Sequence, residues 1–329
     1  MCMWIARGDD SAGSVDLQCL PDRCPYLHKS PSPELASASR LIGIEPHGDA
    51  AVLTISARTV ADDVKHGASI AVNGTCLTVV AWGEGWWEAD VVDESLRAFG
   101  AVDAPSTWVL SNHDQVRHAT RLTLDPNADQ GDRIHGVGPK TQPRPDEALG
   151  QRRARGASTF MLALPGGAYL YQGEELGLPE AIDIPDADRQ DPTFWRTNGE
   201  AYGRDGCRVP IPWEADKPSY GFGPSNESWL PQPANYRQYS RDLQEGVSGS
   251  TLELYKTLLK LRRDNALGTG SLAWIETNNE GVLAFANNGI RVFFNMTDAP
   301  FALPDGEVLA TSADVSSGSL PAAAAVWLR

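Results

Sequence analysis

Cysteine is scarce in this sequence, and its scarcity excludes two classes of protein. The cysteines are odd in number and far apart along 329 residues, which argues against a disulfide framework. Cys19 and Cys24 have no second pair of ligands nearby, so they make a poor zinc site and we expect no metal. We expect no cofactor either. The five cysteines are Cys2, Cys19, Cys24, Cys76 and Cys207.

Basic residues and long apolar runs are also in short supply. The 28 lysines and arginines are outnumbered by 43 aspartates and glutamates, which gives a formal net charge of -15. Nucleic acids and anionic membranes bind basic surfaces, so neither is an expected partner. No apolar run reaches membrane-spanning length, and the opening MCMWIARGDD is too short and too acidic for a signal peptide. We therefore expect a cytoplasmic protein that handles a small molecule, and the oligomeric state stays open.

Residues 1–40 show neither the helical period nor the strand period. The string SPSPELASAS within them has the composition of a linker. The sequence therefore predicts a leader without regular structure. A mis-assigned start codon would also produce such a featureless stretch before a patterned region.

Residues 41–92 carry strand signals. AVLTIS, SIAV and TCLTVVAW are rich in Val, Ile, Thr and Trp and are separated by breaks such as HGD and KHG. Asn73 and Gly74 lie between two such runs and predict a hairpin, because both residues tolerate positive φ. Short strands at this spacing predict a partial small antiparallel β-barrel.

The strings EPHGDAAVLTIS and SIAVNGTCLTVV resemble the N-terminal lumazine-binding barrel of riboflavin synthase, α chain. The resemblance implies a pteridine pocket that involves Ser69, Cys76 and Thr78. A small buried thiol and an ordinary strand threonine explain Cys76 and Thr78 without a ligand. Because riboflavin synthase uses two barrels per chain and only one partial barrel is found here, we expect at most binding of lumazine or riboflavin.

The strand pattern changes to a helical pattern within EADVVDESLRAFG, near residue 92. Domain boundaries usually contain exposed, flexible residues, yet no linker rich in Pro, Ser or Gly separates the two patterns. We interpret the join as a gene fusion, a deletion or an assembly product.

The segment TWVLSNHDQVRH, residues 107–118, places polar residues directly after a strand-forming run. Strands of a parallel barrel deliver side chains to a catalytic face in this way. A core strand that leads into an Asx turn, with His113 and Asp114 merely solvated, would give the same pattern.

This segment resembles the last catalytic motif of the α-amylase superfamily, in particular of bacterial α-glucosidases. The resemblance continues through GAYLYQGEELG and RDGCRVPIPW to the C-terminus. It implies the seventh and eighth strands of a (β/α)8 barrel within residues 93–270 and a C-terminal β-sandwich over residues 271–329. The predicted fold class is thus α/β plus all-β, with a partial TIM barrel made of its last strands and helices only. RRARGASTFMLALPG and TLELYKTLLKLRR have helical spacing.

The resemblance assigns a role to each polar residue of the motif. Asp114 matches the third carboxylate of the retaining enzymes, which binds sugar hydroxyls more strongly as the ring approaches an oxocarbenium ion. His113 matches a residue that binds the same hydroxyls, and Arg117 matches a cation near the leaving group. Asn112 fixes the turn. The implied substrate is a short α-glucoside oligosaccharide, a neutral small molecule hydrolysed at its terminal α-glucosidic bond.

Other polar and aromatic residues can be explained without a role in catalysis. We interpret His118 and His135 as surface or supporting residues. Glu174 and Glu175 follow the predicted eighth strand, where the resemblance implies structure and pocket wall rather than acid/base chemistry. We expect Asp205 and Arg208 to tie down the long loop. The loop's aromatic residues would stack on sugar rings or pack the loop itself: Trp195, Tyr202, Trp213, Tyr220, Phe222 and Trp229.

The sequence lacks two motifs that the family needs for hydrolysis. In the family, the nucleophile lies in a Gly-Phe-Arg-x-Asp strand and the acid/base lies on another strand. Both strands precede the Asn-His-Asp motif. No Gly-x-Arg-x-Asp string occurs in the 329 residues. We therefore expect that roughly the first six β/α units are missing and that the chain has no meaningful glucosidase turnover. We also expect the C-terminal sandwich to unfold separately from residues 93–265. The alternative function is a module that binds a flavin precursor.

Overall fold

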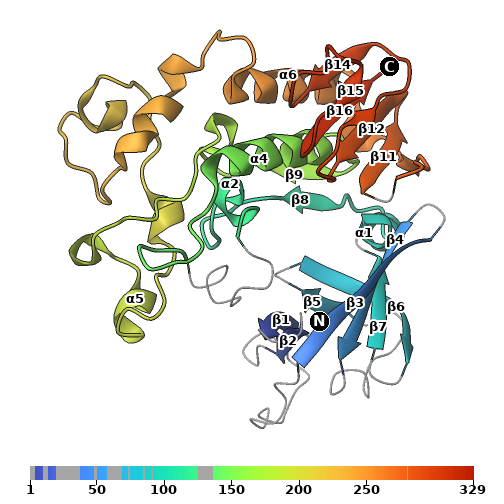
Figure 1. Cartoon of the computed structure of the whole chain (residues 1–329), viewed down its shortest axis with the longest axis horizontal. Coiled ribbons are helices and arrows are strands. Elements are labelled where there is room, and N and C mark those ends of the chain that lie inside the picture. Colours follow the sequence, from blue (N-terminus) through green and yellow to red (C-terminus); the bar gives the residue numbers. More distant parts are fainter. Residues whose placement is uncertain are drawn as a thin grey trace. The chain divides into compact units, whose positions relative to one another are not determined.

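The computed structural model divides the chain into two compact units, which are described separately (Figure 1). The first unit contains Met1–Ser106 and Pro126–Gln130, and the second contains Thr107–Asp125 and Gly131–Arg329. Before residue 92 the description covers only the backbone of the strands. The described residues are 4–9, 14–19, 38–47, 50–57, 69–72, 75–83, 86–90, 92–124, 136–279 and 281–329.

The first unit contains a seven-stranded antiparallel sheet with the order β1-β2-β3-β4-β7-β6-β5, followed by helix α1. Val72 pairs with Thr75 at the end of the β5–β6 ladder, so the hairpin predicted at Asn73 and Gly74 is confirmed, although both turn residues lie outside the described part. The elements are β1 (Trp4–Asp9), β2 (Ser14–Cys19), β3 (Ala38–His47), β4 (Ala50–Ala57), β5 (Ser69–Val72), β6 (Thr75–Gly83), β7 (Trp86–Asp90) and α1 (Val92–Gly100).

Two of these strands lie where the sequence predicts a leader without regular structure. β1 pairs with β2, and β2 pairs in turn with β3. Along β2, Val15, Leu17 and Cys19 alternate with polar residues, which is the period of a strand. The alternation is short and interrupted by turn-forming residues on both sides, so it is easily missed in the sequence. The structure therefore differs from the prediction at β1 and β2.

The second unit begins with a parallel pair of strands. β8 (Thr107–Val109) pairs with β9 (Gly167–Tyr169), and Trp108 lies opposite Ala168. The connection between them contains helices α2 (His118–Arg121) and α4 (Glu147–Met161). Parallel strands joined through helices form the β/α arrangement that the sequence predicts for this region.

Helices α4 and α6 (Thr251–Asp264) match the two segments with helical spacing, so both predictions are confirmed. Each begins at a side-chain cap, because Asp146 accepts a hydrogen bond from the backbone N–H of Leu149 and Ser250 accepts one from that of Glu253. The buried residues of α6 are Leu252, Leu254, Tyr255 and Leu258.

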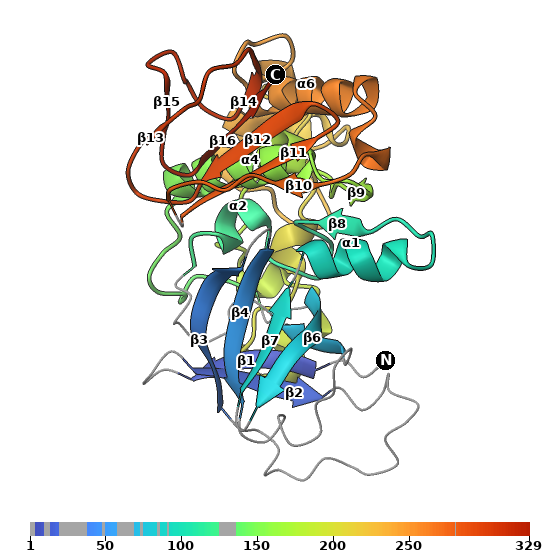
Figure 2. The ribbon, with the colours of Figure 1, turned by 90° about the vertical axis from the view of Figure 1, so that its right-hand side faces the viewer.

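Residues after α6 form a five-stranded antiparallel sheet, β10-β11-β12-β16-β14, and a separate pair, β13-β15. Helix α4 lies along the larger sheet in both ribbon views (Figures 1 and 2). The indole of Trp327 donates to the Thr159 carbonyl at 2.8 Å, and the Phe160 and Phe285 rings meet edge to face. The strands are β10 (Ala273–Trp274), β11 (Val282–Asn287), β12 (Ile290–Asn295), β13 (Phe301–Ala302), β14 (Val308–Thr311), β15 (Ser319–Leu320) and β16 (Ala324–Leu328).

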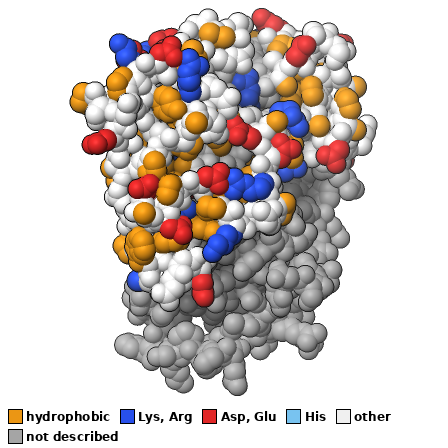
Figure 3. All heavy atoms as spheres, turned by 60° about the vertical axis from the view of Figure 1, so that its left-hand side comes forward, with side chains coloured by type: hydrophobic (Ala, Val, Ile, Leu, Met, Phe, Trp, Pro, Cys, Tyr) orange, Lys and Arg blue, Asp and Glu red, His pale blue; other side chains and the backbone are white. Residues whose placement is uncertain are grey.

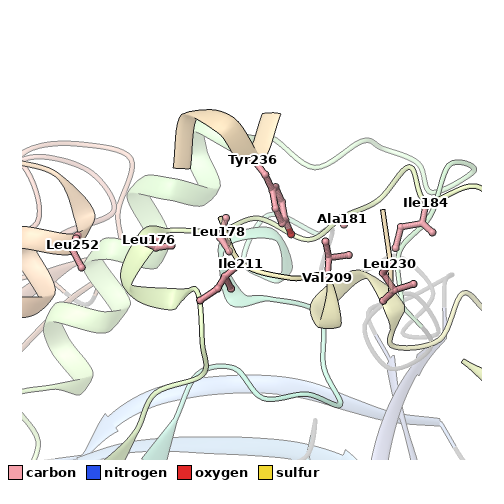
Figure 4. Close-up of a cluster of buried hydrophobic side chains, with 9 residues drawn as sticks. All are labelled: Leu176, Leu178, Ala181, Ile184, Val209, Ile211, Leu230, Tyr236 and Leu252. Atoms are coloured by element: carbon pink, nitrogen blue, oxygen red, sulfur yellow. The ribbon is translucent and has the colours of Figure 1, made fainter. Parts of the chain in front are cut away.

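A long segment between β9 and α6 has little regular structure but its own hydrophobic core (Figure 4). Within it, the hydroxyl of Tyr236 donates to the Pro179 carbonyl at 2.9 Å. The core contains Leu176, Leu178, Ala181, Ile184, Val209, Ile211, Leu230, Tyr236 and Leu252. The segment's helices are η4 (Glu174–Leu176), η5 (Asp186–Asp188), α5 (Pro192–Arg196), η6 (Asp205–Arg208), η7 (Pro218–Gly221), η8 (Ala234–Tyr239) and η9 (Arg241–Leu243), with η10 (Leu267–Thr269) after α6.

Among the helices that the structure describes, none combines the length and the apolar character needed to cross a membrane.

Candidate functional site

The site is built on the turn that follows β8. The side chain of Asn112 accepts a hydrogen bond from the backbone N–H of Asp114 at 2.8 Å, which closes an Asx turn. The turn leaves the next two side chains in solvent, with 67% of His113 and 49% of Asp114 exposed. A strand that ends in a side-chain-closed turn therefore presents an imidazole and a carboxylate together.

Two arginines hold one oxygen of the Asp114 carboxylate. Arg204 Nη1 donates to Oδ1 at 2.8 Å and Arg208 Nη2 donates to the same oxygen at 2.9 Å. The second oxygen, Oδ2, lies 3.3 Å from His113 Nε2. Partial burial acts to raise the pKa of Asp114, but the Arg204 hydrogen bond and the charges of the three neighbours outweigh it and hold the pKa below its usual value. Asp114 is therefore ionised at neutral pH.

Arg204 links Asp114 to a second, buried carboxylate. Its Nε donates to Asp191 Oδ2 at 2.7 Å, and its backbone N–H donates to the same oxygen at 3.0 Å. Asp191 also caps α5 by accepting from the backbone N–H of Thr193. Burial acts to raise the pKa of Asp191, but these hydrogen bonds, with that from Arg204 the largest, hold it well below its usual value. The result is a chain of charges, Asp114, Arg204 and Asp191.

The residues after Arg204 complete the support. Arg208 Nε donates to the backbone carbonyl of His113 at 2.8 Å, so Arg208 holds both the carboxylate and its neighbour. Asp205 accepts hydrogen bonds from the backbone N–H groups of Gln190 and Asp191 and thus ties the loop, as the sequence predicts. Arg204 was not singled out from the sequence, although it is the first residue of the RDGCRVPIPW string.

Arg117 has an environment different from the one that the resemblance implies. Its side chain is buried, and its guanidinium donates to the carbonyls of Gln172 at 2.7 Å and Cys207 at 2.9 Å. It also lies over the ring of Tyr171. These contacts indicate that Arg117 joins the end of β9 to the long loop. They do not fit a cation that faces a leaving group. The motif locates Arg117 in the sequence but does not predict that its side chain is buried.

His118 lies in a buried polar network. Its Nδ1 is 2.9 Å from Ser111 Oγ and its Nε2 is 3.4 Å from Ser158 Oγ, which in turn lies 2.6 Å from the Tyr255 hydroxyl. Burial lowers the pKa of His118 to about 3, so the ring is neutral and supports the strand exit. His135 lies outside the described residues.

Of the glutamates that follow β9, Glu174 and Glu180 are buried and Glu175 is half-buried, so they do not form an exposed acid/base pair. Glu174 accepts a hydrogen bond from the backbone N–H of Tyr171, and Glu180 accepts one from that of Arg117. Burial raises the pKa of each to about 7. Glu175 accepts from the backbone N–H of Gly173. The buried Glu180 was not predicted, because no pattern in the sequence around it indicates burial.

The predicted lumazine residues can be placed only by backbone. Ser69 pairs with Thr78, and Cys76 pairs with Ala71, across β5 and β6. Their side chains lie outside the described part of the structure, so the pocket remains a prediction. In the parts of the chain that the structure does describe, no cluster of three or more His, Cys, Asp or Glu side chains could hold a metal ion.

The arrangement around Asp114 suits recognition of hydroxyl groups. An ionised carboxylate with one oxygen already held keeps its other oxygen available to accept hydrogen bonds from a ligand, and His113 stands beside that oxygen. Of the two carboxylates in the charge chain, only Asp114 is exposed.

Two family models match the chain. "Alpha amylase, catalytic domain" matches residues 90–270, and "Lumazine binding domain" matches residues 36–103. The two matches overlap in the region of α1.

Curated relatives are glucosidases. A "Probable alpha-glucosidase" of Rhizobium meliloti (strain 1021) is 33% identical over 217 residues, 63% of this chain and 34% of the relative. An oligo-1,6-glucosidase of Saccharomyces cerevisiae is 25% identical over 244 residues, 65% of this chain and 39% of the relative. The chain spans between 21% and 39% of the length of the curated relatives it matches.

Solved structures agree on the fold. An alpha-glucosyl transfer enzyme is 30% identical, with a TM-score of 0.51 over 73% of this chain and 43% of that one. A trehalulose synthase mutant at 22% identity, which supports the fold alone, has a TM-score of 0.52 over 72% and 45% of the two chains. Because the alpha-amylase catalytic-domain model matches more than half of the 329 residues, the chain belongs to the α-amylase family.

Proposed function

We propose that this chain carries the hydroxyl-binding part of an α-glucosidase site, with Asp114 as the carboxylate that stabilises the transition state. The observation that carries the proposal is the half-exposed, ionised Asp114 at the exit of β8, held on one oxygen by Arg204 and Arg208. Curated relatives named as α-glucosidases support the choice of substrate class, a short α-glucoside oligosaccharide.

The chemistry follows from the unequal carboxylate oxygens. Oδ2 would accept hydrogen bonds from two neighbouring sugar hydroxyls while His113 contacts the same hydroxyls from the side. In a retaining mechanism these bonds strengthen as the ring gains oxocarbenium character. Asn112 contributes by holding the turn, and Arg117 contributes by holding the loop behind it.

The same residues would not hydrolyse the bond alone. Retention needs a nucleophile and an acid/base on opposite sides of the glycosidic bond, and Glu174 and Glu180 are buried.

We propose that β8 and β9 are the seventh and eighth strands of a (β/α)8 barrel within residues 93–270 and that residues 271–329 form the C-terminal domain. We place the chain in the cytoplasm.

Glucose release tests the absence of turnover. The purified 329-residue chain, incubated with maltose or 4-nitrophenyl α-glucoside, should release no more glucose or nitrophenol than buffer does. Saturation-transfer NMR should nevertheless detect contact between the protein and the protons of maltose. Product formation that disappears in Asp114→Asn would overturn the claim of no turnover.

Binding of a flavin precursor is a second candidate function. It is supported by the lumazine-binding model that matches residues 36–103, which include the proposed 41–92 domain with Ser69, Cys76 and Thr78. Adding the protein to riboflavin should quench the flavin fluorescence at micromolar protein, and maltose should not reverse the quenching. Unchanged flavin fluorescence would remove this candidate.

A further inference from the structure

The structure separates the aromatic residues of the long loop into two groups. Tyr202 is buried and Tyr220 packs against the loop's hydrophobic core, so packing accounts for both. Trp195 and Trp229 instead have 55% and 52% of their surfaces exposed to solvent. Trp213 and Phe222 are also exposed. On the face that Figure 3 presents, hydrophobic side chains stand among charged ones. Packing of the loop does not explain why large rings remain exposed.

The Trp195 side chain is exposed, but contacts with residues of the same loop fix its position. Its Nε1 donates to the Arg189 carbonyl at 3.3 Å, and its ring meets the Phe194 ring edge to face at 5.1 Å. Phe194 stacks on Tyr202 at 6.2 Å, and the buried Arg189 guanidinium lies over both rings at 5.1 and 4.7 Å. The indole therefore has one hydrogen bond and one ring contact that fix its orientation before any ligand arrives.

This indole borders a cavity of about 440 Å³, here called the Trp195 pocket. The volume lies within the range typical of small-ligand sites, ~300–1,000 Å³. Lys140, Asp186 and Asn198 also line it, and their side chains carry an ammonium, a carboxylate and an amide. A rigid aromatic wall with a few polar side chains is the usual composition of a small-molecule site.

The balance of these groups selects the ligand class. The single cation and single anion cancel, and the whole chain carries a net charge of -15, so phosphate-bearing ligands such as nucleotides are disfavoured. A neutral ring with hydroxyls could place its C–H face on the indole and its hydroxyls against the amide and the carboxylate. A sugar ring meets both requirements.

We propose that the Trp195 pocket is a second sugar-binding site, which takes a pyranose ring of an α-glucoside and does not use Asp114. The choice of an α-glucoside, rather than another sugar, rests on the proposed function. The two sites share a support, because Asp191 caps α5, the helix that contains Trp195, and also bonds to Arg204, which holds Asp114.

Calorimetric titration of maltose into Asp114→Asn isolates the Trp195 pocket. This variant should bind one maltose per chain, and Asp114→Asn/Trp195→Ala should bind at least tenfold more weakly. Trp195→Phe, which keeps an aromatic ring, should restore most of the affinity in the same background. Trp229→Ala, which removes a similarly exposed indole from a different cavity, should leave the affinity unchanged.

The outcomes separate the two proposals. If wild type binds maltose but Asp114→Asn does not, the second site is overturned and the proposed function stands. Equal affinity with and without Trp195 also overturns the second site, as does equally strong binding of open-chain sorbitol, which has no ring face. If Asp114→Asn binds maltose as wild type does in both affinity and stoichiometry, the Trp195 pocket is supported and the role of Asp114 fails. Matching far-UV circular dichroism and melting temperatures confirm that all variants are folded.

Discussion

At the residue scale, the two oxygens of the Asp114 carboxylate have unequal surroundings. Oδ1 receives hydrogen bonds from Arg204 and Arg208, whereas Oδ2 has His113 as its neighbour. The two arginines also differ from each other, because Arg204 reaches the buried Asp191, whereas Arg208 reaches the exposed carboxylate and a backbone carbonyl. The two guanidiniums should therefore contribute differently to stability.

Removing Arg204 should cost more stability than removing Arg208. Arg204→Ala leaves the fully buried Asp191 side chain without its charged partner, so we expect a loss of about 2 kcal/mol, a value reduced because Arg204 itself is partly exposed. Arg208→Ala breaks a pair with a half-exposed carboxylate and should cost less than about 1 kcal/mol. Urea unfolding monitored by circular dichroism measures both, and equal losses would contradict the account.

Glu174 should make stability depend on pH. Its carboxyl is buried, which raises its pKa from 4.5 to about 7. The folded state thus binds the proton more tightly than the unfolded chain, so the contribution of Glu174 is full below pH 4.5 and is lost as the pH rises through 7.

Glu174→Gln removes that loss while keeping an acceptor for the backbone N–H of Tyr171. At pH 8.5 the variant should be more stable than wild type by about 1–3 kcal/mol, and at pH 4.5 the advantage should vanish. Urea titrations at the two pH values provide the measurement. An equal difference at both would mean that ionisation of Glu174 plays no part.

At the element scale, helices α4 and α6 were predictable, whereas strands β1 and β2 and the long loop were not. Helix α6 follows from the spacing of Leu252, Tyr255 and Leu258, and the turn at Asn112 follows from a short local motif. Arg204 and Arg208 lie 90 and 94 residues from Asp114, and no local pattern connects positions that far apart. The loop core likewise gathers residues without any period, so its contacts depend on tertiary packing alone.

Gly206 shows why the loop tolerates few changes. A Cβ added there would lie 2.5 Å from Glu180 Oε1 and 2.8 Å from the backbone oxygen of Ala181. Gly206→Ala should therefore destabilise the protein by about 1–3 kcal/mol. Gly223→Ala is the matched control, since no atom of the described residues lies within 4 Å of its added Cβ. Melting temperatures of both variants test this, and equal temperatures would mean that the loop adapts freely at Gly206.

At the scale of the whole molecule, the second unit has contacts that cross the domain boundary predicted at residue 270. The C-terminal sheet rests on α4, with Trp327 fully buried and bonded to Thr159. Arg262 of α6 also donates to the carbonyls of Leu162 and Leu164, at the end of α4. The alternation of residues 271–329 predicts their strands but gives no sign of which helix covers them.

Residues 107–329 should therefore unfold in one transition, in place of the separate transitions expected from the sequence. Tryptophan fluorescence and far-UV circular dichroism recorded along the same urea gradient should give coincident curves for this unit, expressed as residues 107–329. Trp327→Phe, which loses the hydrogen bond to Thr159, should shift both curves equally. A C-terminal transition that separates from the rest would restore the sequence-based division.

The proposed role of Asp114 is to bind the hydroxyls of an α-glucoside. Calorimetric titration of maltose into Trp195→Ala tests it most directly, because this variant lacks the second proposed site. Trp195→Ala should bind one maltose per chain, and adding Asp114→Asn should lower the affinity at least tenfold. Unchanged affinity in the double variant would contradict it.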